Sequence, residues 1–131
     1  MAKPGRLAAI ARIALGLIFL VLGLNYFLAM FAMPPLPPRA GAFYGALGAT
    51  RYMLPLIMGT EVIGGALLLS GWMTPLALVI LAPVIVNIIG FHLFLDPAGI
   101  APGIVVTALE LFLAWQYRAA FAPLFDWGGA T

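Results

Sequence analysis

Long apolar runs, separated by prolines, glycines and single polar residues, constrain this sequence more than any other feature. The first run, residues 13–33, contains one strongly polar side chain, Asn25. A helix that crosses a bilayer needs about 20 predominantly apolar residues. Only 8% of the 131 residues are charged, whereas a soluble domain carries about 25%, so the chain lacks the polar surface of a water-facing globule. These features predict an integral membrane protein.

The number of runs predicts an all-α, integral membrane four-helix bundle that forms a single domain over residues 1–131. The predicted helices cover about 7–33, 52–70, 74–95 and 100–121. The proline- and glycine-rich stretch 34–51 is predicted to be an outer loop, because proline cannot continue a helix. The first helix follows a basic N-terminus, as a secretory signal does. Its apolar run is longer than the roughly 7–15 residues of such a signal, so we expect it to be retained.

The basic residues predict the orientation of the bundle. With the N-terminus inside, the inner side holds Lys3, Arg6, Arg12 and Arg118, and the outer side holds Arg39 and Arg51. Lysine and arginine concentrate on the cytoplasmic side of membrane proteins. We therefore expect both termini in the cytoplasm.

Charge, cysteine content and motif spacing exclude several classes of function. The net charge of +2, with no basic patch, gives no reason to expect a nucleic-acid partner. The absence of cysteine excludes disulfides and thiol chemistry. The Glu-x-x-His spacing that helical metal sites use is also absent, so we expect no metal site. The expected partners are membrane lipids and other membrane subunits or further copies of the chain.

Five polar side chains lie inside the predicted spans and are candidate ligand-binding residues. They are Glu61, Glu110, Asn87, His92 and Asn25. Ionisable residues within a membrane span are costly, usually face the bundle interior and mark functional positions. With a rise of about 1.5 Å per residue, both glutamates fall near the middle of their helices, and His92 lies roughly 10 Å from the midpoint of its own. No residue is predicted to be catalytic.

Small residues share helix faces with the two glutamates. Gly64 and Gly65 follow Glu61 by about one turn, where they would allow another helix to approach closely. Gly103 and Thr107 precede Glu110 on one seam of the fourth span. We expect these four small residues to be helix-packing positions that face inward.

Three interpretations of the buried polar groups remain open. They can hydrogen-bond to one another and fix the helix register, at about 1 kcal/mol or less per bond. One glutamate can be protonated and donate a hydrogen bond to the carbonyl of a quinone, a lipid or another lipophilic ligand. Two glutamates and the histidine can also form a metal or proton site. For His92 there is a simpler role, because Asp96 lies one turn later and the pair can anchor the helix end.

The order and spacing of several short motifs resemble the DoxX family. The motifs are residues 61–69 (EVIGGALLL), Gly71 with 74–78 (TPLAL), 81–87 (LAPVIVN), 91–97 (FHLFLDP) and 109–115 (LELFLAW). The similarity extends over about residues 15–125. It implies a small four-helix protein of the bacterial inner membrane, in which Glu61, Asn87, His92 and Glu110 are the family-like polar positions. Related proteins include a subunit of a thiosulfate:quinone oxidoreductase and components of oxidative-stress complexes with thiol enzymes, although this chain has no cysteine for a thiol role.

The leading functional hypothesis is an accessory or interaction subunit of a larger membrane complex of the redox type. Nearly all of the predicted mass lies in helices, and the tails are too short for a soluble active domain. A first alternative is a binding protein or small oxidoreductase subunit for a quinone or other lipophilic ligand in an intramembrane Glu/Asn/His pocket. A second is an oligomeric transporter for a small molecule or protons, since four helices alone enclose little space.

Overall fold

The computed structural model describes residues 4–128 and has an all-α architecture with no strand in that range. Its four long helices are α1 (Arg6–Leu28), α3 (Met53–Ser70), α4 (Thr74–Phe94) and α5 (Ile100–Gln116). Each is long and apolar enough to cross a membrane, α5 together with the short turn η1 (Pro97–Gly99) that precedes it. The predicted fold class, a membrane four-helix bundle, is confirmed. Lys3, which the orientation argument used, lies outside the described residues.

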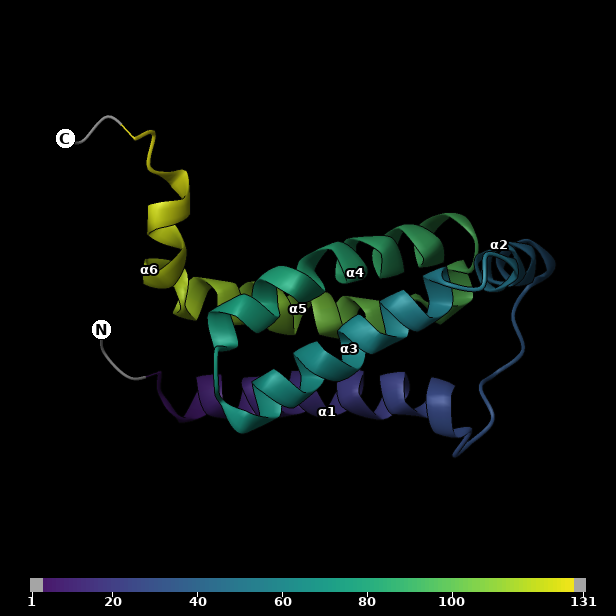
Figure 1. The fold of residues 1–131 in the computed structure, drawn as a ribbon, viewed down its shortest axis with the longest axis horizontal. Coiled ribbons are helices and arrows are strands. Elements are labelled where there is room, and N and C mark those ends of the chain that lie inside the picture. Colours follow the sequence, from purple (N-terminus) through teal and green to yellow (C-terminus); the bar gives the residue numbers. More distant parts are fainter. Residues whose placement is uncertain (1–3, 129–131) are drawn as a thin grey trace.

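The four helices run along the long axis of the molecule, and each packs against two others (Figure 1). The order around the bundle is α1, α3, α4, α5, so that α3 and α5 occupy opposite corners. α1 begins and α5 ends at one end of the bundle, here called the terminal end (Figure 1). The opposite end carries the helix α2 (Pro38–Ala49) and is called the α2 end. The interior is therefore enclosed by four helices and covered by a fifth at one end only.

The contact between α1 and α3 is the most extensive in the bundle, and glycines make it close. A Cβ atom built on Gly65 would lie 2.6 Å from the backbone nitrogen of Leu20 and 2.8 Å from the carbonyl oxygen of Gly16. A Cβ on Gly23 would lie 2.9 Å from the carbonyl oxygen of Met58. Backbones can approach in this way only where side chains are absent, which is the usual role of small residues between membrane helices.

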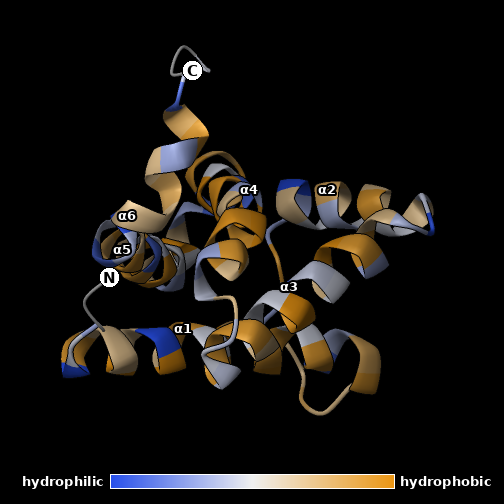
Figure 2. Cartoon of the chain, turned by 60° about the vertical axis from the view of Figure 1, so that its left-hand side comes forward, coloured by the Kyte–Doolittle hydropathy of each residue, from blue (hydrophilic) through white to orange (hydrophobic). Residues whose placement is uncertain are grey.

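The core is a column of aliphatic side chains with one aromatic ring. Its largest fully buried members are Phe19, Leu15, Leu68, Leu78, Leu81 and Leu113. The outward faces are also apolar, as the hydropathy colours show on both sides of the helices (Figure 2). A helix that is hydrophobic all round is one that is surrounded by protein or lipid. Hydrocarbon therefore suits the outer surface of this bundle.

The first helix is shorter than predicted. α1 ends at Leu28, whereas the sequence predicted a helix to residue 33. Ala29 takes a left-handed conformation (φ 49°, ψ 50°), and its N–H donates to the carbonyl of Asn25. The Asn25 side chain then binds the backbone of Phe31 and holds the chain in this turn. The prediction failed because the apolar run continues to Met33 although the helix does not.

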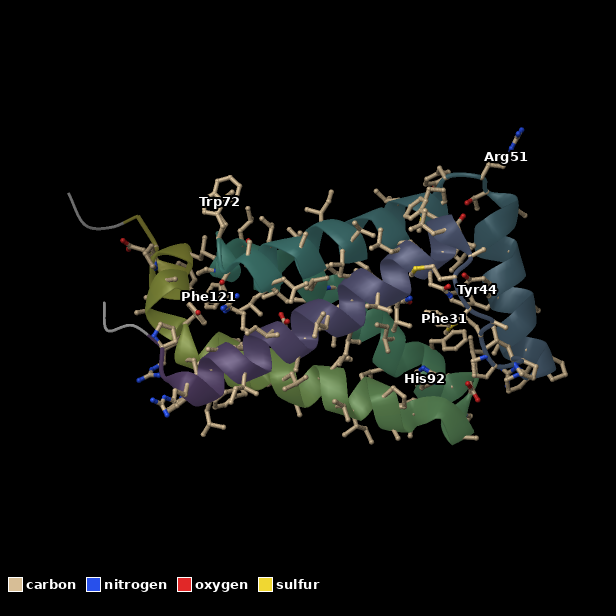
Figure 3. The ribbon with its side chains drawn as sticks, turned by 90° about the horizontal axis from the view of Figure 1, so that it is seen from below. Phe31, Tyr44, Arg51, Trp72, His92 and Phe121 are labelled. Carbon is tan, nitrogen blue, oxygen red and sulfur yellow. The ribbon has the colours of Figure 1, made fainter. Side chains whose placement is uncertain are left out.

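The segment 34–51 was predicted to be a loop, and most of it is instead the helix α2. The four prolines at 34, 35, 37 and 38 do prevent a helix up to that point, but Pro38 is the first residue of α2, where its fixed φ favours the helix and its missing N–H costs nothing. α2 lies across the α2 end of the bundle, seen lengthwise in Figure 3. Phe43 packs against Phe91 of α4, with ring centroids 6.0 Å apart.

The last two spans differ from the prediction mainly at their C-terminal ends. α4 continues through Pro83 and ends at Phe94, one residue before the predicted 95. α5 ends at Gln116 instead of 121, because Tyr117 leaves the helical conformation (φ −99°, ψ 16°). The chain then turns away from the bundle through α6 (Arg118–Phe121) and η2 (Ala122–Phe125) (Figure 1).

Gly65→Ala is expected to lower the free energy of unfolding by about 1–3 kcal/mol, the usual cost of overpacking, because the added methyl group collides with the backbone of α1. The measurement is equilibrium unfolding in mixed micelles of mild detergent and dodecyl sulfate, followed by circular dichroism. Gly59→Ala is the matched control on the same helix, since a Cβ there meets nothing within 4 Å. Equal effects of the two substitutions would show that α1 and α3 do not approach through Gly65.

Candidate functional site

Glu61 lies on the inward face of α3, near the middle of the span. It is the ninth of the 18 residues from Met53 to Ser70, and only 6% of it is exposed. Gly64, Gly65 and Leu68 continue the same buried face toward the terminal end. No hydrogen bond is found for the Glu61 carboxyl among residues 4–128. This acid is therefore buried without a polar partner in the described part of the chain.

On its α2 side, Glu61 has Tyr44 in its neighbourhood. Burial raises the pKa of Tyr44 on α2, and the nearby Tyr26 and Glu61 raise it further. Tyr44 therefore lies within electrostatic range of the carboxyl. Figure 3 shows Tyr44 and Phe31 at the end of the bundle that also carries His92. A phenol group of α2 thus lies near Glu61 on the side of the α2 end.

Glu110 lies on the inward face of α5, in the line of buried residues Gly103, Val106, Glu110 and Leu113. It is 7% exposed, and its Oε2 atom is fully buried with no hydrogen-bond partner in the described structure. In native proteins a buried polar atom without a partner is uncommon, and each one calls for an explanation such as a functional role. In residues 4–128 the other such atom is Oγ1 of Thr74, at the start of α4.

The helix register places the two carboxyls about one turn apart in depth. A Cβ on Gly103 of α5 would touch Ile89 of α4 at 3.4 Å, and one on Gly64 of α3 would collide with Leu81 of α4 at 2.6 Å. Since α4 and α5 are antiparallel, Glu110 is level with the turn of α4 that contains Leu81, and hence with Gly64. Gly64 is three residues from Glu61, which corresponds to about 4.5 Å of helix rise. The acids thus face the interior from opposite corners, with Glu110 nearer the terminal end.

Asn25 does not join the glutamates. Its amide nitrogen donates to the carbonyl of Phe31 at 3.1 Å, and its side-chain oxygen accepts from the Phe31 N–H at 2.9 Å. Both ends of the amide are thereby used to terminate α1. The expectation that Asn25 contributes to an interhelical polar pocket is corrected by these two bonds.

Asn87 points away from the bundle. The buried residues of α4 include Leu81 and Ile85, and a residue two positions after Ile85 lies about 200° around the helix. Asn87 is accordingly exposed, next to Val86, which is 72% exposed. The expectation that its amide faces the interior is wrong, because the buried stripe of α4 runs on the opposite side.

His92 secures the end of α4. Its Nδ1 lies 3.2 Å from the carbonyl oxygen of Asp96 and 3.6 Å from the Asp96 carboxylate. Gly99 in η1 packs against both side chains, since a Cβ there would lie 2.6 Å from the carboxylate and 3.1 Å from the imidazole. The geometry matches the simpler of the two roles, an anchor for the helix end. In residues 4–128 no group of acids and histidines is arranged to hold a metal ion.

The small residues around the acids contact different elements. Gly65 lies against α1 and Gly64 against Leu81 of α4. Gly103 is buried at ordinary contact distance from Ile88 and Ile89. The Thr107 hydroxyl donates to the carbonyl of Gly103 at 2.7 Å, within its own helix. Thr107 is therefore not a hydrogen-bond partner for either glutamate.

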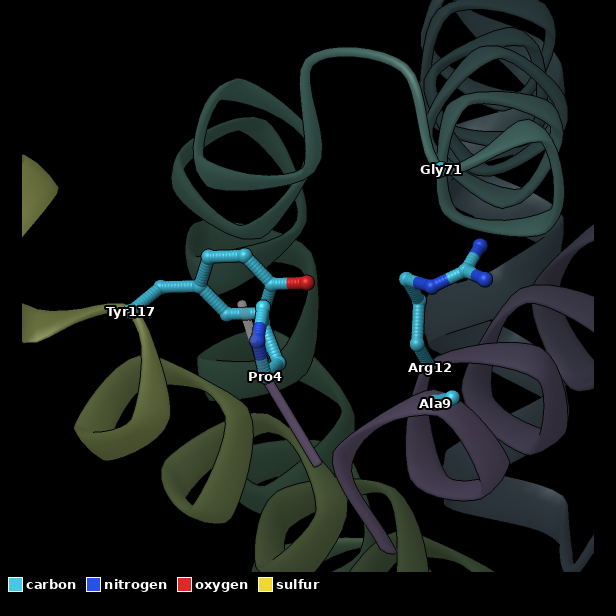
Figure 4. A pocket seen from close by; sticks show the side chains of 5 residues that line it. All are labelled: Pro4, Ala9, Arg12, Gly71 and Tyr117. Carbon is cyan, nitrogen blue, oxygen red and sulfur yellow. The ribbon is translucent and has the colours of Figure 1, made fainter. Parts of the chain in front are cut away.

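Arg12 has a role that the sequence reasoning missed. The sequence reasoning used it only for the orientation of the bundle, but it lies in the second turn of α1, and its Nη1 donates to the carbonyls of Leu68 and Leu69 at the end of α3. A cation is favourable at a helix C-terminus. Arg12, Pro4, Ala9, Gly71 and Tyr117 line an open hollow of about 230 Å³, in which the Tyr117 hydroxyl points toward Arg12 (Figure 4). The position of Arg12 inside the predicted helix was the sequence feature that could have indicated this role.

Comparisons with protein-family models, with curated proteins and with solved structures find no match to this chain. The resemblance to the DoxX family therefore remains a proposal.

Asn25→Leu is expected to lower the free energy of unfolding by about 1–3 kcal/mol, because it leaves the Phe31 backbone groups without partners. Thermal unfolding in detergent, with Thr60→Val as the control, measures the effect. Thr60 bonds only to a carbonyl of its own helix, so its removal should change little. An unfolding midpoint for Asn25→Leu equal to that of the parent would show that the turn after α1 does not depend on this amide.

Proposed function

We propose that this chain is a small multi-pass membrane protein of the DoxX type that binds a lipophilic molecule carrying a polar head group. The single observation behind the proposal is the pair of carboxyls, Glu61 and Glu110, which are 6% and 7% exposed, face the bundle interior and make no hydrogen bond in residues 4–128; of their oxygen atoms, Oε2 of Glu110 is fully buried. Hydrocarbon supplies no partner for a polar group. An incoming carbonyl or hydroxyl would satisfy these acids.

In the alternative interpretation, the polar groups only stabilise the fold by bonding to one another, but the expected hydrogen-bond partners of the glutamates are engaged elsewhere or face away. Asn25 is occupied by Phe31, Asn87 faces outward, and Thr107 bonds within its helix. That alternative requires hydrogen bonds between these groups and the glutamates. The two acids therefore keep a capacity for hydrogen bonding that the described chain does not use.

The surroundings of Glu61 favour a ligand with one polar end and an apolar body. The buried core of the bundle consists of leucine, alanine, isoleucine, valine and phenylalanine side chains, while Tyr44 and Tyr26 add phenol groups on the α2 side. A protonated carboxyl or a phenol can donate to a carbonyl oxygen. A quinone or a comparable lipid carbonyl fits this combination, with Glu61 as the first polar contact and Glu110 as a deeper one.

An accessory subunit of a larger, redox-type membrane complex is the second candidate. It is favoured by the distribution of the described residues, almost all of which belong to four membrane helices and their connections. Such a chain offers helix surfaces to other membrane subunits and no separate soluble domain within residues 4–128. Quinone binding and a subunit role are compatible.

We place the protein in the bacterial inner membrane with both termini in the cytoplasm. Arg6, Arg12 and Arg118 belong to the terminal end, and Arg39 and Arg51 to the segments at the α2 end. The positive-inside bias then puts the terminal end in the cytoplasm. In this orientation α2 and its Tyr44 lie at the outer leaflet, and we propose that the ligand approaches the carboxyls from that side.

The proposal is tested by titrating the detergent-purified chain with a short-chain benzoquinone and following its intrinsic tryptophan fluorescence. Glu61→Leu should weaken binding about tenfold or more, because one hydrogen bond to a charged or strongly polar group is worth about 1.5 kcal/mol. Glu110→Leu tests the deeper contact in the same way. Leucine suits the apolar surroundings, so loss of binding would not reflect loss of the fold.

Asp96→Asn is the matched control, since it removes a carboxylate at the end of α4 and not inside the bundle. Unchanged quinone affinity in both leucine variants would overturn ligand binding. Native mass spectra of the same preparation address the second candidate, because a subunit of a larger complex should retain a different co-purifying membrane protein.

A further inference from the structure

The outward face of α4 carries an amide in a position where lipid would leave it without a partner. Asn87 is the fourteenth of the 21 residues from Thr74 to Phe94, about three residues from the midpoint of the helix. At 1.5 Å per residue this is roughly 4–5 Å from the centre of the span. Asn87 is exposed, and no hydrogen bond is found for its side chain among residues 4–128. An amide that is moved into hydrocarbon without a partner costs several kcal/mol.

The surroundings of Asn87 have the features by which membrane helices pack against each other. Leu76, Val79, Pro83, Val86, Gly90 and Phe94 follow one another at steps of three and four along the same outward stripe. A Cβ built on Gly90 would meet no atom of another described element within 4 Å. Pro83 has no N–H, so the carbonyl of Val79 lacks its usual helical donor. A small residue one turn from a polar one permits close approach and an interhelical hydrogen bond.

We infer that this face of α4 binds the same face of a second copy of the chain, with the two Asn87 amides hydrogen-bonded to each other. A primary amide is both donor and acceptor, so it is complementary to itself. In a two-fold dimer each residue on the axis meets its own copy. Two copies inserted in one membrane with the same orientation bring their α4 helices together in parallel, which places Asn87 opposite Asn87.

The charge of the face also favours a second copy. The stripe contains no acidic or basic side chain, so it offers no charge to select a different partner. Its one strong polar group needs a partner with both a donor and an acceptor at the same depth, and a second Asn87 supplies both. The dimer leaves the interior around Glu61 and Glu110 untouched, and it is independent of ligand binding there.

Because the native chain has no cysteine, single cysteines report the contact directly. Gly90→Cys, in the full-length chain reconstituted in liposomes, should form a disulfide-linked dimer on mild oxidation. Ile63→Cys on α3 and Leu111→Cys on α5 are the controls, because these side chains are 58% and 65% exposed on other helices and should remain monomeric. Cross-linking of Gly90→Cys no stronger than that of the controls would overturn the inference.

A second variant tests the contribution of the Asn87 amide to dimerisation. Asn87→Leu should lower the dimerisation constant about 3- to 30-fold, measured by energy transfer between labelled copies, as expected for an interhelical bond of about 0.6–2 kcal/mol. The helical circular dichroism of the monomer should not change, because no hydrogen bond is found for the Asn87 side chain among residues 4–128. An unaltered dimerisation constant would contradict the amide pair. Oxidation of Gly90→Cys in native membranes that captures only a different protein would contradict the second copy.

Discussion

The absence of hydrogen-bonding partners in hydrocarbon controls the arrangement of polar groups in this protein. Every polar group in a span must be satisfied by the chain, by a ligand or by a neighbouring protein. Arg12 and Asn25 are satisfied by backbone carbonyls and N–H groups at helix ends, and they fix those ends in place. Glu61, Glu110 and Asn87 have no such partner in the described residues. Some polar groups therefore stabilise the bundle, and others remain available to hydrogen-bond to a ligand or to a neighbouring protein.

The available groups fall on two surfaces with different consequences. Glu61 and Glu110 face the apolar interior of the bundle, where we propose that a small lipophilic molecule with a polar head binds. Asn87 faces the outside, which suits another helix at the same depth. The close α1–α3 contact is made through Gly16 and Gly65 and does not involve the outward face of α4. Ligand binding and dimerisation can therefore coexist, because they use opposite faces of the helices.

Much of the fold follows from the sequence, because span length and hydropathy determine it almost alone. The inward direction of Glu61 and Glu110 was also predictable from the small residues that share their faces. The end of α1 was not, since it depends on the contact of Asn25 with Phe31 and not on hydropathy. α2 was missed because prolines were taken to exclude a helix that Pro38 in fact begins. Asn87 was misplaced because an apolar helix in a membrane gives no periodic signal for its buried face.

The inward direction of the two glutamates is tested most directly by nitroxide labels on single cysteines in liposomes. Labels at positions 61 and 110 should show low collision rates with oxygen, which is concentrated among the acyl chains. Labels at the exposed neighbours Ile63 and Leu111 should show high rates. Equal rates at all four positions would mean that the carboxyls face lipid, and the interior site proposed for them would not exist.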